Sequence, residues 1–330
     1  HREAREKLES GEWQAVVGTH ALITENVTYQ KLGLVITDEQ HRFGVRQRTL
    51  LSEKGQDVNV LVMSATPIPR TLALILYGDL DISLLDELPP GRTPVQTRIV
   101  PEEKREAMYG FLREQVKAGR QVYVVCPLIE ESEVMPDART AESVYRELKD
   151  DKLPDLRVAL VHGRMKPKEK EAVLSGFHSG EIDVLVSTTV IEVGVNVPNA
   201  SVMVIEDADR FGLAQLHQLR GRVGRGAALS YCFLMAQPNE RLRLMTKTND
   251  GFIIAQKDME LRGPGELFGF RQTGEAAIGL AACAGDTVLL HETHEMAQWV
   301  LRSPDDPEAR QVARMAQSRF AEQIRQAGVN

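Results

Sequence analysis

The chain has 330 residues, of which 42% are hydrophobic and 26% charged, and this composition excludes a disordered chain, a collagen-like repeat and a coiled-coil rod. The longest uninterrupted apolar runs, 72–77 and 231–236, have six residues each and are too short to cross a bilayer. The formal net charge of −7, taken for the whole chain, argues against a nucleic-acid partner.

Short apolar segments alternate with amphipathic ones as far as about residue 236, a pattern typical of βα units on a parallel sheet. The largely continuous apolar character of these segments favours strands that are covered on both faces. Two clear helical patterns between them are Glu102–Lys117 and Pro167–His178. The predicted strands are Ala15–Val17, Leu34–Ile36, Val60–Met63, Val122–Pro127, Arg157–Val161, Asp183–Ser187, Val202–Ile205 and Tyr231–Met235.

Segment 88–94 holds three prolines and one glycine in seven residues, so it can continue neither a helix nor a central strand. We therefore place a domain linker there. After Gln237 the strand patterns stop, and residues 238–262 and 286–326 are predicted to be helical, with a glycine-rich loop between them. The sequence thus predicts an α/β fold divided into residues 1–92, 93–237 and a helical part, 238–330.

The three cysteines, Cys126, Cys232 and Cys283, are far apart, odd in number and set among apolar residues, which favours small buried side chains over a disulfide or zinc site. His291 and His294 are separated by three positions rather than the four that a helical zinc-protease motif requires. We expect them to be solvated positions on a helix. With no signal-peptide core at the N-terminus, these features predict a cytoplasmic protein.

Two predicted strands in the first part of the chain are followed by polar side chains. Asp38 and Glu39 come almost directly after the strand that ends at Ile36. Ligands of parallel sheets bind at the carboxyl ends of the strands. There, one carboxylate can hold a hydrated Mg²⁺ while its neighbour polarises the water that attacks a γ-phosphate. Ser64 and Thr66 follow the next strand and can hydrogen-bond a strand-end carboxylate. The alternatives are a solvated acidic turn and an ordinary strand-ending turn.

The second part of the chain contains two comparable segments. Ser187 and Thr188 end a predicted strand, where hydroxyls and amides can bind nucleic-acid phosphates, although an ordinary strand exit explains them equally well. Arg222 and Arg225 are three positions apart, so on one helical turn they would present two guanidinium groups to a single site. A surface ion-pair helix is the alternative, but the interleaved glycines would weaken such a helix.

Taken in order, Asp-Glu-x-His, Ser-Ala-Thr and Gln-x-x-Gly-Arg-x-Gly-Arg resemble motifs II, III and VI of the superfamily-two helicases. The amino-acid sequences of segments 36–45, 63–71 and 215–226 are similar to those of the RecG family of bacterial ATP-dependent DNA helicases. Segment 257–274 resembles the translocation motif that this family shares with the transcription-repair coupling factor Mfd. The resemblance covers most of the chain and implies two RecA-like lobes followed by a helical extension.

The resemblance also implies roles for individual residues. Asp38 would be the Mg²⁺ carboxylate, acting through water, and Glu39 the base that activates the attacking water. Arg222 and Arg225 would be arginine fingers. The other nucleotide-binding positions would be His41, Gly194 and Gln218, and the residues that contact DNA or couple it to nucleotide state would be Thr19, His20, Ser64, Thr66, Ser187, Thr188, Arg262 and Gln272.

These assignments imply ATP and Mg²⁺ as cofactors and branched double-stranded DNA, such as forks and four-way junctions, as the partner of a monomeric protein without membrane contact. Residues 210–275 carry ten basic and six acidic side chains, so this part of an acidic chain is suited to phosphates. An Mfd-like coupling translocase remains the alternative enzyme.

The sequence departs from the family pattern because it contains no Gly-x-x-x-x-Gly-Lys-[Ser/Thr] phosphate loop. The resemblance implies that this loop and an N-terminal wedge domain lie upstream of His1. We therefore expect an incomplete first lobe with exposed apolar faces, and a chain that is inactive alone. A non-catalytic nucleic-acid-binding fragment is accordingly the third alternative.

Overall fold

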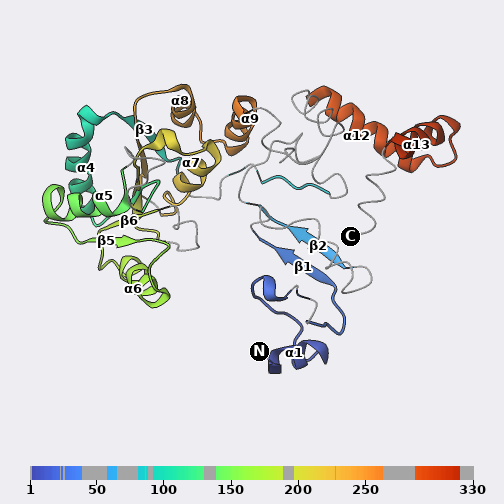
Figure 1. Cartoon of the computed structure of the whole chain (residues 1–330), viewed down its shortest axis with the longest axis horizontal. Coiled ribbons are helices and arrows are strands. Elements are labelled where there is room, and N and C mark those ends of the chain that lie inside the picture. Colours follow the sequence, from blue (N-terminus) through green and yellow to red (C-terminus); the bar gives the residue numbers. More distant parts are fainter. Residues whose placement is uncertain are drawn as a thin grey trace. The chain divides into compact units, whose positions relative to one another are not determined.

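The computed structural model of the chain describes residues 2–22, 24, 27–38, 58–64, 81–85, 87, 92–129, 139–188, 197–226, 228–262 and 287–319. The chain divides into two compact units, one made of residues 1–66 with 291–330 and the other of residues 67–290 (Figure 1). Each unit contains a parallel sheet. The predicted α/β class, with parallel sheets and C-terminal helices, is confirmed.

The second unit is built on a six-stranded parallel sheet with the order β3-β8-β7-β4-β6-β5. The central strands β4, β6 and β7 are buried along their whole length, because their valine-rich sequences leave no polar face. The expectation of strands covered on both faces is confirmed for them. The strands are β3 (Gln96–Val100), β4 (Gln121–Val125), β5 (Val158–Val161), β6 (Val184–Ser187), β7 (Ala200–Ile205) and β8 (Tyr231–Met235).

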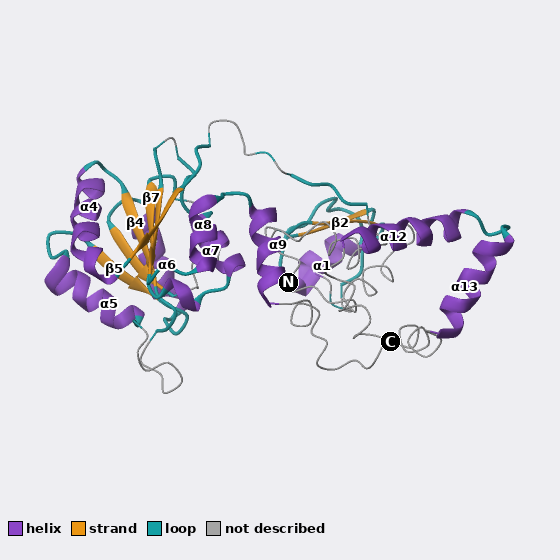
Figure 2. Cartoon of the chain, turned by 90° about the horizontal axis from the view of Figure 1, so that it is seen from above, coloured by secondary structure: helices purple, strands orange, loops and turns teal. Residues whose placement is uncertain are grey.

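Helices cover both faces of this sheet, with α4 and α5 on one side and α6, α7 and α8 on the other (Figure 2). Leu112 and Val144 pack in the first layer, whereas Phe177, Leu216 and Met245 pack in the second. These helices are α4 (Arg105–Lys117), α5 (Ala141–Glu147), α6 (Pro167–His178), α7 (Leu213–Arg220) and α8 (Glu240–Lys247), and α9 (Gly251–Arg262) follows them.

Local sequence signals explain where several of these helices begin. Thr140 and Ser143 form a reciprocal capping box at the start of α5. The Asn239 side chain caps α8 by accepting a hydrogen bond from the amide of Leu242 at 2.9 Å. Pro167 opens α6, where its missing N–H group costs nothing.

The first unit contains a smaller sheet of two parallel strands, β1 (Leu34–Thr37) and β2 (Asn59–Val62), preceded by α1 (Arg2–Glu9) and the short 3₁₀ helix His20–Leu22. Leu34 and Ile36 of β1 are each 56% exposed, and Leu61 and Met63 at β2 are also exposed. The expected exposed apolar face is therefore present among the described residues of this sheet.

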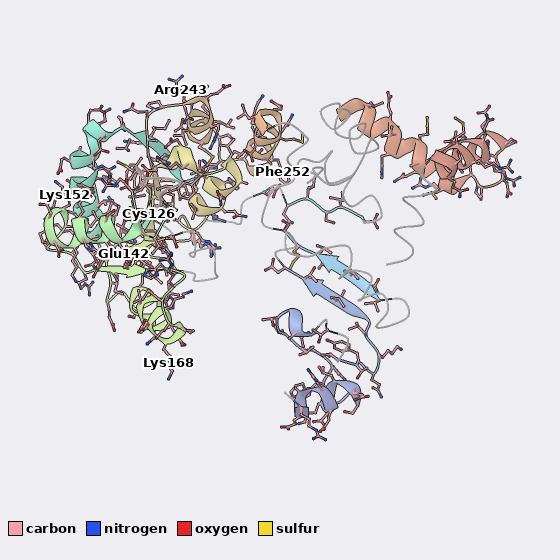
Figure 3. The ribbon with its side chains drawn as sticks, in the orientation of Figure 1. Cys126, Glu142, Lys152, Lys168, Arg243 and Phe252 are labelled. Atoms are coloured by element: carbon pink, nitrogen blue, oxygen red, sulfur yellow. The ribbon has the colours of Figure 1, made fainter. Side chains whose placement is uncertain are left out.

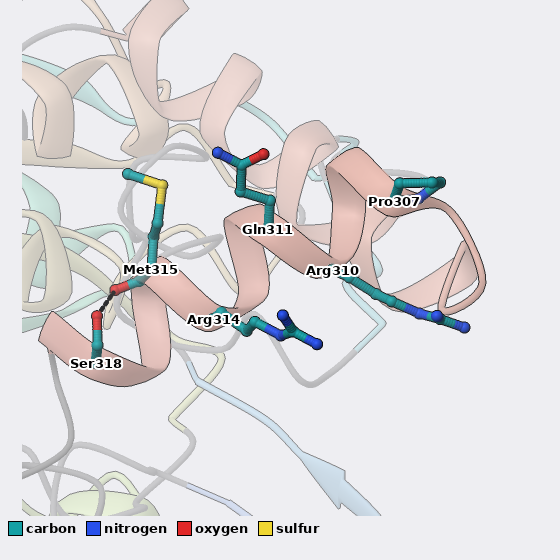
Figure 4. A pocket seen from close by; sticks show the side chains of 6 residues that line it. All are labelled: Pro307, Arg310, Gln311, Arg314, Met315 and Ser318. Atoms are coloured by element: carbon teal, nitrogen blue, oxygen red, sulfur yellow. Dashed lines mark hydrogen bonds between the residues drawn. The ribbon is translucent and has the colours of Figure 1, made fainter.

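Two helices follow the second unit's strands at the C-terminal end, α12 (Thr287–Arg302) and α13 (Pro307–Arg319). The Asp306 side chain caps α13 through the amide of Glu308 at 2.8 Å. Side chains of α13 line a shallow pocket that includes Arg310, Arg314 and Met315 (Figure 4). Among the described helices, none combines the length and the apolar character needed to cross a membrane.

The structure corrects three local predictions. Residues 15–17 form no strand, and Val17 is fully exposed because no described strand pairs with it. Strand β3 was missed because Gln96 and Arg98 alternate with apolar residues at the edge of the sheet, where one side of the strand faces solvent. The helical stretches 238–262 and 287–319 are each interrupted, at 248–250 and at 303–306.

Candidate functional site

The ends of β1 and β2 lie side by side in the first unit. Thr37 pairs with Val62 in a parallel register, and the Met63 amide donates to the Thr37 carbonyl at 2.8 Å. Asp38 and Ser64 follow these positions, so both lie at the carboxyl edge of the sheet, and both are exposed. The sequence therefore located this edge correctly, and an exposed carboxylate there suits a hydrated cation.

The structure describes several other predicted site residues only in part or not at all. Thr19 is exposed and precedes the 3₁₀ helix that contains the backbone of His20. Arg262 is the last residue of α9. The positions Glu39, His41, Thr66, Gly194 and Gln272 lie outside the described residues, as do the side chains of His20 and Arg262 and the whole of Cys283.

In the second unit, Ser187 is the last residue of β6 and has no exposed surface, and Thr188 follows it at 5% exposure. Among the described residues, no hydrogen-bond partner reaches the Ser187 hydroxyl oxygen. Its side chain lies on the same face of the sheet as that of Leu185, two residues earlier, which packs with α6 and α7. The strand-end hydroxyls are thus where the sequence placed them.

Arg222 and Arg225 do not share a helical turn, and that prediction is wrong. Helix α7 ends at Arg220, with Gly221 as its C-cap, because glycines interrupt the helical pattern here. Both arginines therefore lie in the following loop, which is anchored at the Gly221 carbonyl oxygen. Arg225 Nε and the Arg92 guanidinium each donate to that oxygen at 3.3 Å.

The loop that carries the two arginines is held close to the second unit's core. Gly224 has a φ of 77°, and a β-carbon there would lie 2.9 Å from a methyl group of Val95. A β-carbon at Gly226 would lie 2.5 Å from the Pro198 carbonyl oxygen. These two glycines therefore allow the backbone of the loop to lie close against its neighbours.

The arginines also act on a buried tyrosine of the neighbouring sheet. Burial raises the pKa of Tyr123 to about 12, while the positive charges of Arg222 and Arg225 oppose that rise. Tyr123 lies on β4 and packs against Phe177 of α6 with ring centroids 4.8 Å apart. The two guanidinium groups are therefore close enough to Tyr123 for their charge to act on its hydroxyl.

Arg220 is a structural residue that the sequence analysis did not single out, although it stands between two motif positions. It is 3% exposed, and one of its nitrogens donates to the carbonyl oxygens of Met245 at 2.8 Å and Thr248 at 2.9 Å. These carbonyls belong to the C-terminal end of α8, where a positive charge is favourable. Arg220 thus joins the end of α7 to the end of α8.

The environment of His217 predicts that the second unit loses stability as the pH falls. Its Nδ1 lies 3.0 Å from an Arg220 nitrogen, and burial together with the Arg220 charge lowers the pKa of His217 to about 4. Because the unfolded imidazole takes up a proton near pH 6.5, the unfolded state gains protons first as the pH falls. We expect about 3 kcal/mol of stability to be lost between pH 6.5 and pH 4.

Denaturant unfolding measured across this pH window tests the expectation. The His217→Gln variant cannot titrate there and should show a flatter pH profile than the wild type. Equal slopes for the two proteins would contradict the assignment of the pH effect to His217.

A buried ion cluster at the end of β7 is the second feature that the sequence analysis missed. The Glu206 carboxylate, 2% exposed, accepts hydrogen bonds from Arg105 of α4 at 2.7 and 3.0 Å. Arg139 lies 3.3 Å from the same carboxylate and also pairs with Glu147 of α5. The next residue, Asp207, has a φ of 46° and accepts the Arg139 amide proton at 2.7 Å. The cluster therefore fixes the chain as it leaves β7 toward α7.

Comparison with known protein families covers most of the chain. Residues 1–75 match the DEAD/DEAH box helicase family, residues 103–227 match the helicase conserved C-terminal domain, and residues 248–330 match the family described as ATP-dependent DNA helicase RecG, domain 3, C-terminal. These three segments follow one another in the order that the sequence motifs predicted.

Individual relatives agree with these matches. The chain is 53% identical over 307 residues to the ATP-dependent DNA helicase RecG of Escherichia coli (strain K12), covering 90% of this chain and 44% of the relative. It is 48% identical to RecG of Streptococcus pneumoniae serotype 4, covering 94% of the chain and 48% of the relative. The solved structure of RecG bound to a three-way DNA junction is 46% identical, with a TM-score of 0.66 over 88% of this chain and 37% of that one. The chain thus spans about half the length of the curated relatives it matches, and it belongs to the RecG family of helicases.

Proposed function

We propose that this chain is the motor part of an ATP-dependent DNA helicase or translocase that remodels branched DNA. The observation that carries the proposal is 46% identity, across 88% of the chain, to a RecG protein solved with a three-way DNA junction. The relatives described above bear the name RecG, which favours this function over an Mfd-like coupling translocase. Forks and four-way junctions are the expected substrates of a monomeric, cytoplasmic protein.

The residues at the carboxyl edge of the first sheet suit nucleotide hydrolysis. Asp38 offers an exposed carboxylate that would hold Mg²⁺ through water, and His41 would lie nearby in sequence. When bound, Mg²⁺ neutralises charge on the β- and γ-phosphates of ATP. Glu39 would orient and deprotonate the attacking water. Ser64 lies at the same edge, which supports a role for Ser64, together with Thr66, in relaying the nucleotide state to DNA.

The second unit would contribute charge and DNA contacts. Arg222 and Arg225 lie on an anchored loop rather than in a core, so their guanidinium groups can stabilise phosphoryl-transfer charge, with Gln218 and Gly194 beside the nucleotide. The residues proposed to contact DNA or couple it to the nucleotide are Thr19, His20, Ser187, Thr188, Arg262 and Gln272.

We further propose that the domains are residues 1–92, 93–237 and 238–330. The three family matches, at 1–75, 103–227 and 248–330, each fall within one of these ranges, which supports the division. Arg92, the last residue of the first range, donates to the Gly221 carbonyl oxygen in the loop that carries Arg222, so the proposed boundary lies next to a contact with the second domain.

Hydrolysis of ATP tests the proposed function. The full-length protein should hydrolyse ATP faster with forked DNA than with linear DNA. The 330-residue chain should show no turnover, because its sequence contains no Gly-x-x-x-x-Gly-Lys-[Ser/Thr] loop to cradle the phosphates. A full-length protein without DNA-stimulated hydrolysis would contradict the proposal, and turnover by the chain alone would contradict its expected inactivity.

A further inference from the structure

The end of the linker, with the residues that join it to β3, lies against the loop that follows α7. The first of these segments is 92–95, and the second is 221–230, the arginine loop. Each leads directly into a strand, the first into β3 and the second into β8. These strands pair in parallel from Gln96 opposite Tyr231, and the Gln96 amide donates to the Ser230 carbonyl at 2.9 Å. The two segments therefore enter the sheet side by side.

A glycine brings the arginine loop close to the end of the linker. A β-carbon at Gly224 would lie 2.9 Å from a methyl group of Val95 and 3.7 Å from the carbonyl oxygen of Thr93. Gly224 also has a φ of 77°, which favours glycine. Because no side chain fits between the two segments at this point, the position of the arginine loop depends on that of residues 93–95.

Arg92 adds a charged contact between the same two segments. Its guanidinium group donates to the Gly221 carbonyl oxygen at 3.3 Å, and Nε of Arg225 donates to that oxygen at 3.3 Å as well. Gly221 is the C-cap of α7, so its carbonyl lies at the negative end of the helix dipole, where a positive charge is favourable. One arginine from the linker and one from the loop thus share a single acceptor.

The charge of Arg92 also acts on α7 itself. Burial and the charge of Arg220 are the larger causes that lower the pKa of His217, and the charge of Arg92 lowers it further. Arg92 therefore lies beside the last turn of the helix that leads into the arginine loop.

We propose that Arg92 is a positioning residue that holds the Gly221 carbonyl, and through it Arg225, in place for phosphoryl transfer. The inference rests on the proposed function, in which Arg225 stabilises charge on the transferred phosphoryl group. Such stabilisation requires a guanidinium group that is in place before the reaction, and a displacement of about 1 Å can lower the rate about 10²-fold. Anchoring Nε on the backbone of the loop limits the directions in which Arg225 can point.

The place of Arg92 in the chain gives this contact a further consequence. Arg92 is the last residue of the first proposed range, so the covalent connection between the first two ranges passes through the residue that holds the anchor of Arg225. Pro94, two positions later, has a restricted φ, which limits the freedom of this stretch. A change in the linker during ATP hydrolysis would therefore act directly on that anchor.

DNA-stimulated ATP hydrolysis by the full-length protein tests the proposal. Arg92→Ala should lower kcat by about 10-fold to 100-fold and leave the KM for ATP and the affinity for DNA unchanged, because the contact acts on the transition state through Arg225. The matched control is Arg243→Ala, which removes an exposed arginine that projects outward from α8 in Figure 3 and should change neither constant. A raised KM for ATP with an unchanged kcat would make Arg92 a ligand of the nucleotide and overturn the proposal.

A double-mutant cycle shows whether Arg92 acts through Arg225. If it does, Arg92→Ala has nothing left to displace in the Arg225→Ala background, so the double variant should hydrolyse ATP as fast as Arg225→Ala alone. Two effects that multiply would show independent action and overturn the proposal. The cycle remains decisive if Arg92→Ala also lowers the melting temperature, because a general loss of stability would slow both backgrounds alike.

Binding of a transition-state analogue gives a second readout that a purely structural role would not change. The Arg92→Ala variant should bind ADP with aluminium fluoride about tenfold more weakly than the wild type and bind ADP alone equally well, because an arginine finger acts on the transferred group. An unchanged affinity for the analogue would contradict the positioning role.

The Arg225→Ala variant separates a failure of this inference from a failure of the proposed function. If Arg225→Ala leaves ATP hydrolysis unchanged, the proposed role of the arginine loop fails and the inference fails with it. If Arg225→Ala slows hydrolysis but Arg92→Ala does not, only the inference is overturned.

Discussion

In the full-length protein, Arg222→Ala is expected to lower DNA-stimulated ATP hydrolysis by about 10³-fold while leaving the fold and DNA binding in place. The reason is positional. Arg222 lies in the loop after α7 and is only half-buried, so its removal leaves the packed layers beneath that loop intact. The measurement is the steady-state ATPase rate with saturating forked DNA, together with the melting temperature.

Arg220→Ala is the matched control for this prediction, because it removes the same side chain two positions earlier. Arg220 is buried and donates to the carbonyl oxygens at the end of α8, so its loss leaves those acceptors unsatisfied. We expect it to cost about 2–3 kcal/mol of stability. If Arg222→Ala lowers the melting temperature as much as Arg220→Ala does, Arg222 is structural and its assignment as an arginine finger fails.

The contrast between these two arginines shows what the sequence could and could not predict. Motif spacing located the loop and its glycines, because a glycine pattern reports directly on backbone geometry. It also suggested one shared helical turn, which was wrong because periodicity alone does not reveal where a helix ends. The structural role of Arg220 depends on carbonyls that lie 25 and 28 residues later, and no local pattern encodes such a contact.

Strands were predictable where their sequences form apolar runs, whether they are buried, as β4 is, or largely exposed, as β1 is. The largely apolar β4, β6, β7 and β8 were located to within two residues, because continuous hydrophobic runs are the signal of central parallel strands. The edge strand β3 was not predicted, whereas segment 15–17 was predicted to be a strand and does not form one. In each case the deciding factor is the presence or absence of a neighbouring strand, and that is a tertiary property.

The ion cluster around Glu206 could not be predicted from the sequence either, because only the tertiary structure brings its members together. They come from α4, from the segment before α5, from α5 itself and from the end of β7. Arg105, Arg139 and Glu206 are separated by more than 30 residues from one another, and each is an ordinary charged residue in its local context. The structure shows that a single carboxylate, 2% exposed, faces two guanidinium groups. Removing that carboxylate would leave the buried Arg105 with the exposed Glu102 as its remaining described carboxylate, while Arg139 would keep Glu147.

Glu206→Gln is therefore expected to destabilise the second unit by about 3–5 kcal/mol, because breaking a buried ion pair from one side leaves an uncompensated charge. For a unit of this size the loss corresponds to a melting temperature lower by about 10 °C. Thermal or urea unfolding of the 330-residue chain measures it.

Two further variants decide whether the loss comes from unpaired buried charge. Glu102→Gln removes the other carboxylate that contacts Arg105, 2.7 Å away, but that side chain is 66% exposed, so we expect little change in stability. Arg105→Met/Glu206→Leu removes the pair from both sides and should be less destabilising than Glu206→Gln, since apolar side chains of similar volume need no partner. If the double variant is less stable than Glu206→Gln, the packing around Arg105 rather than its charge stabilises this part of the second unit.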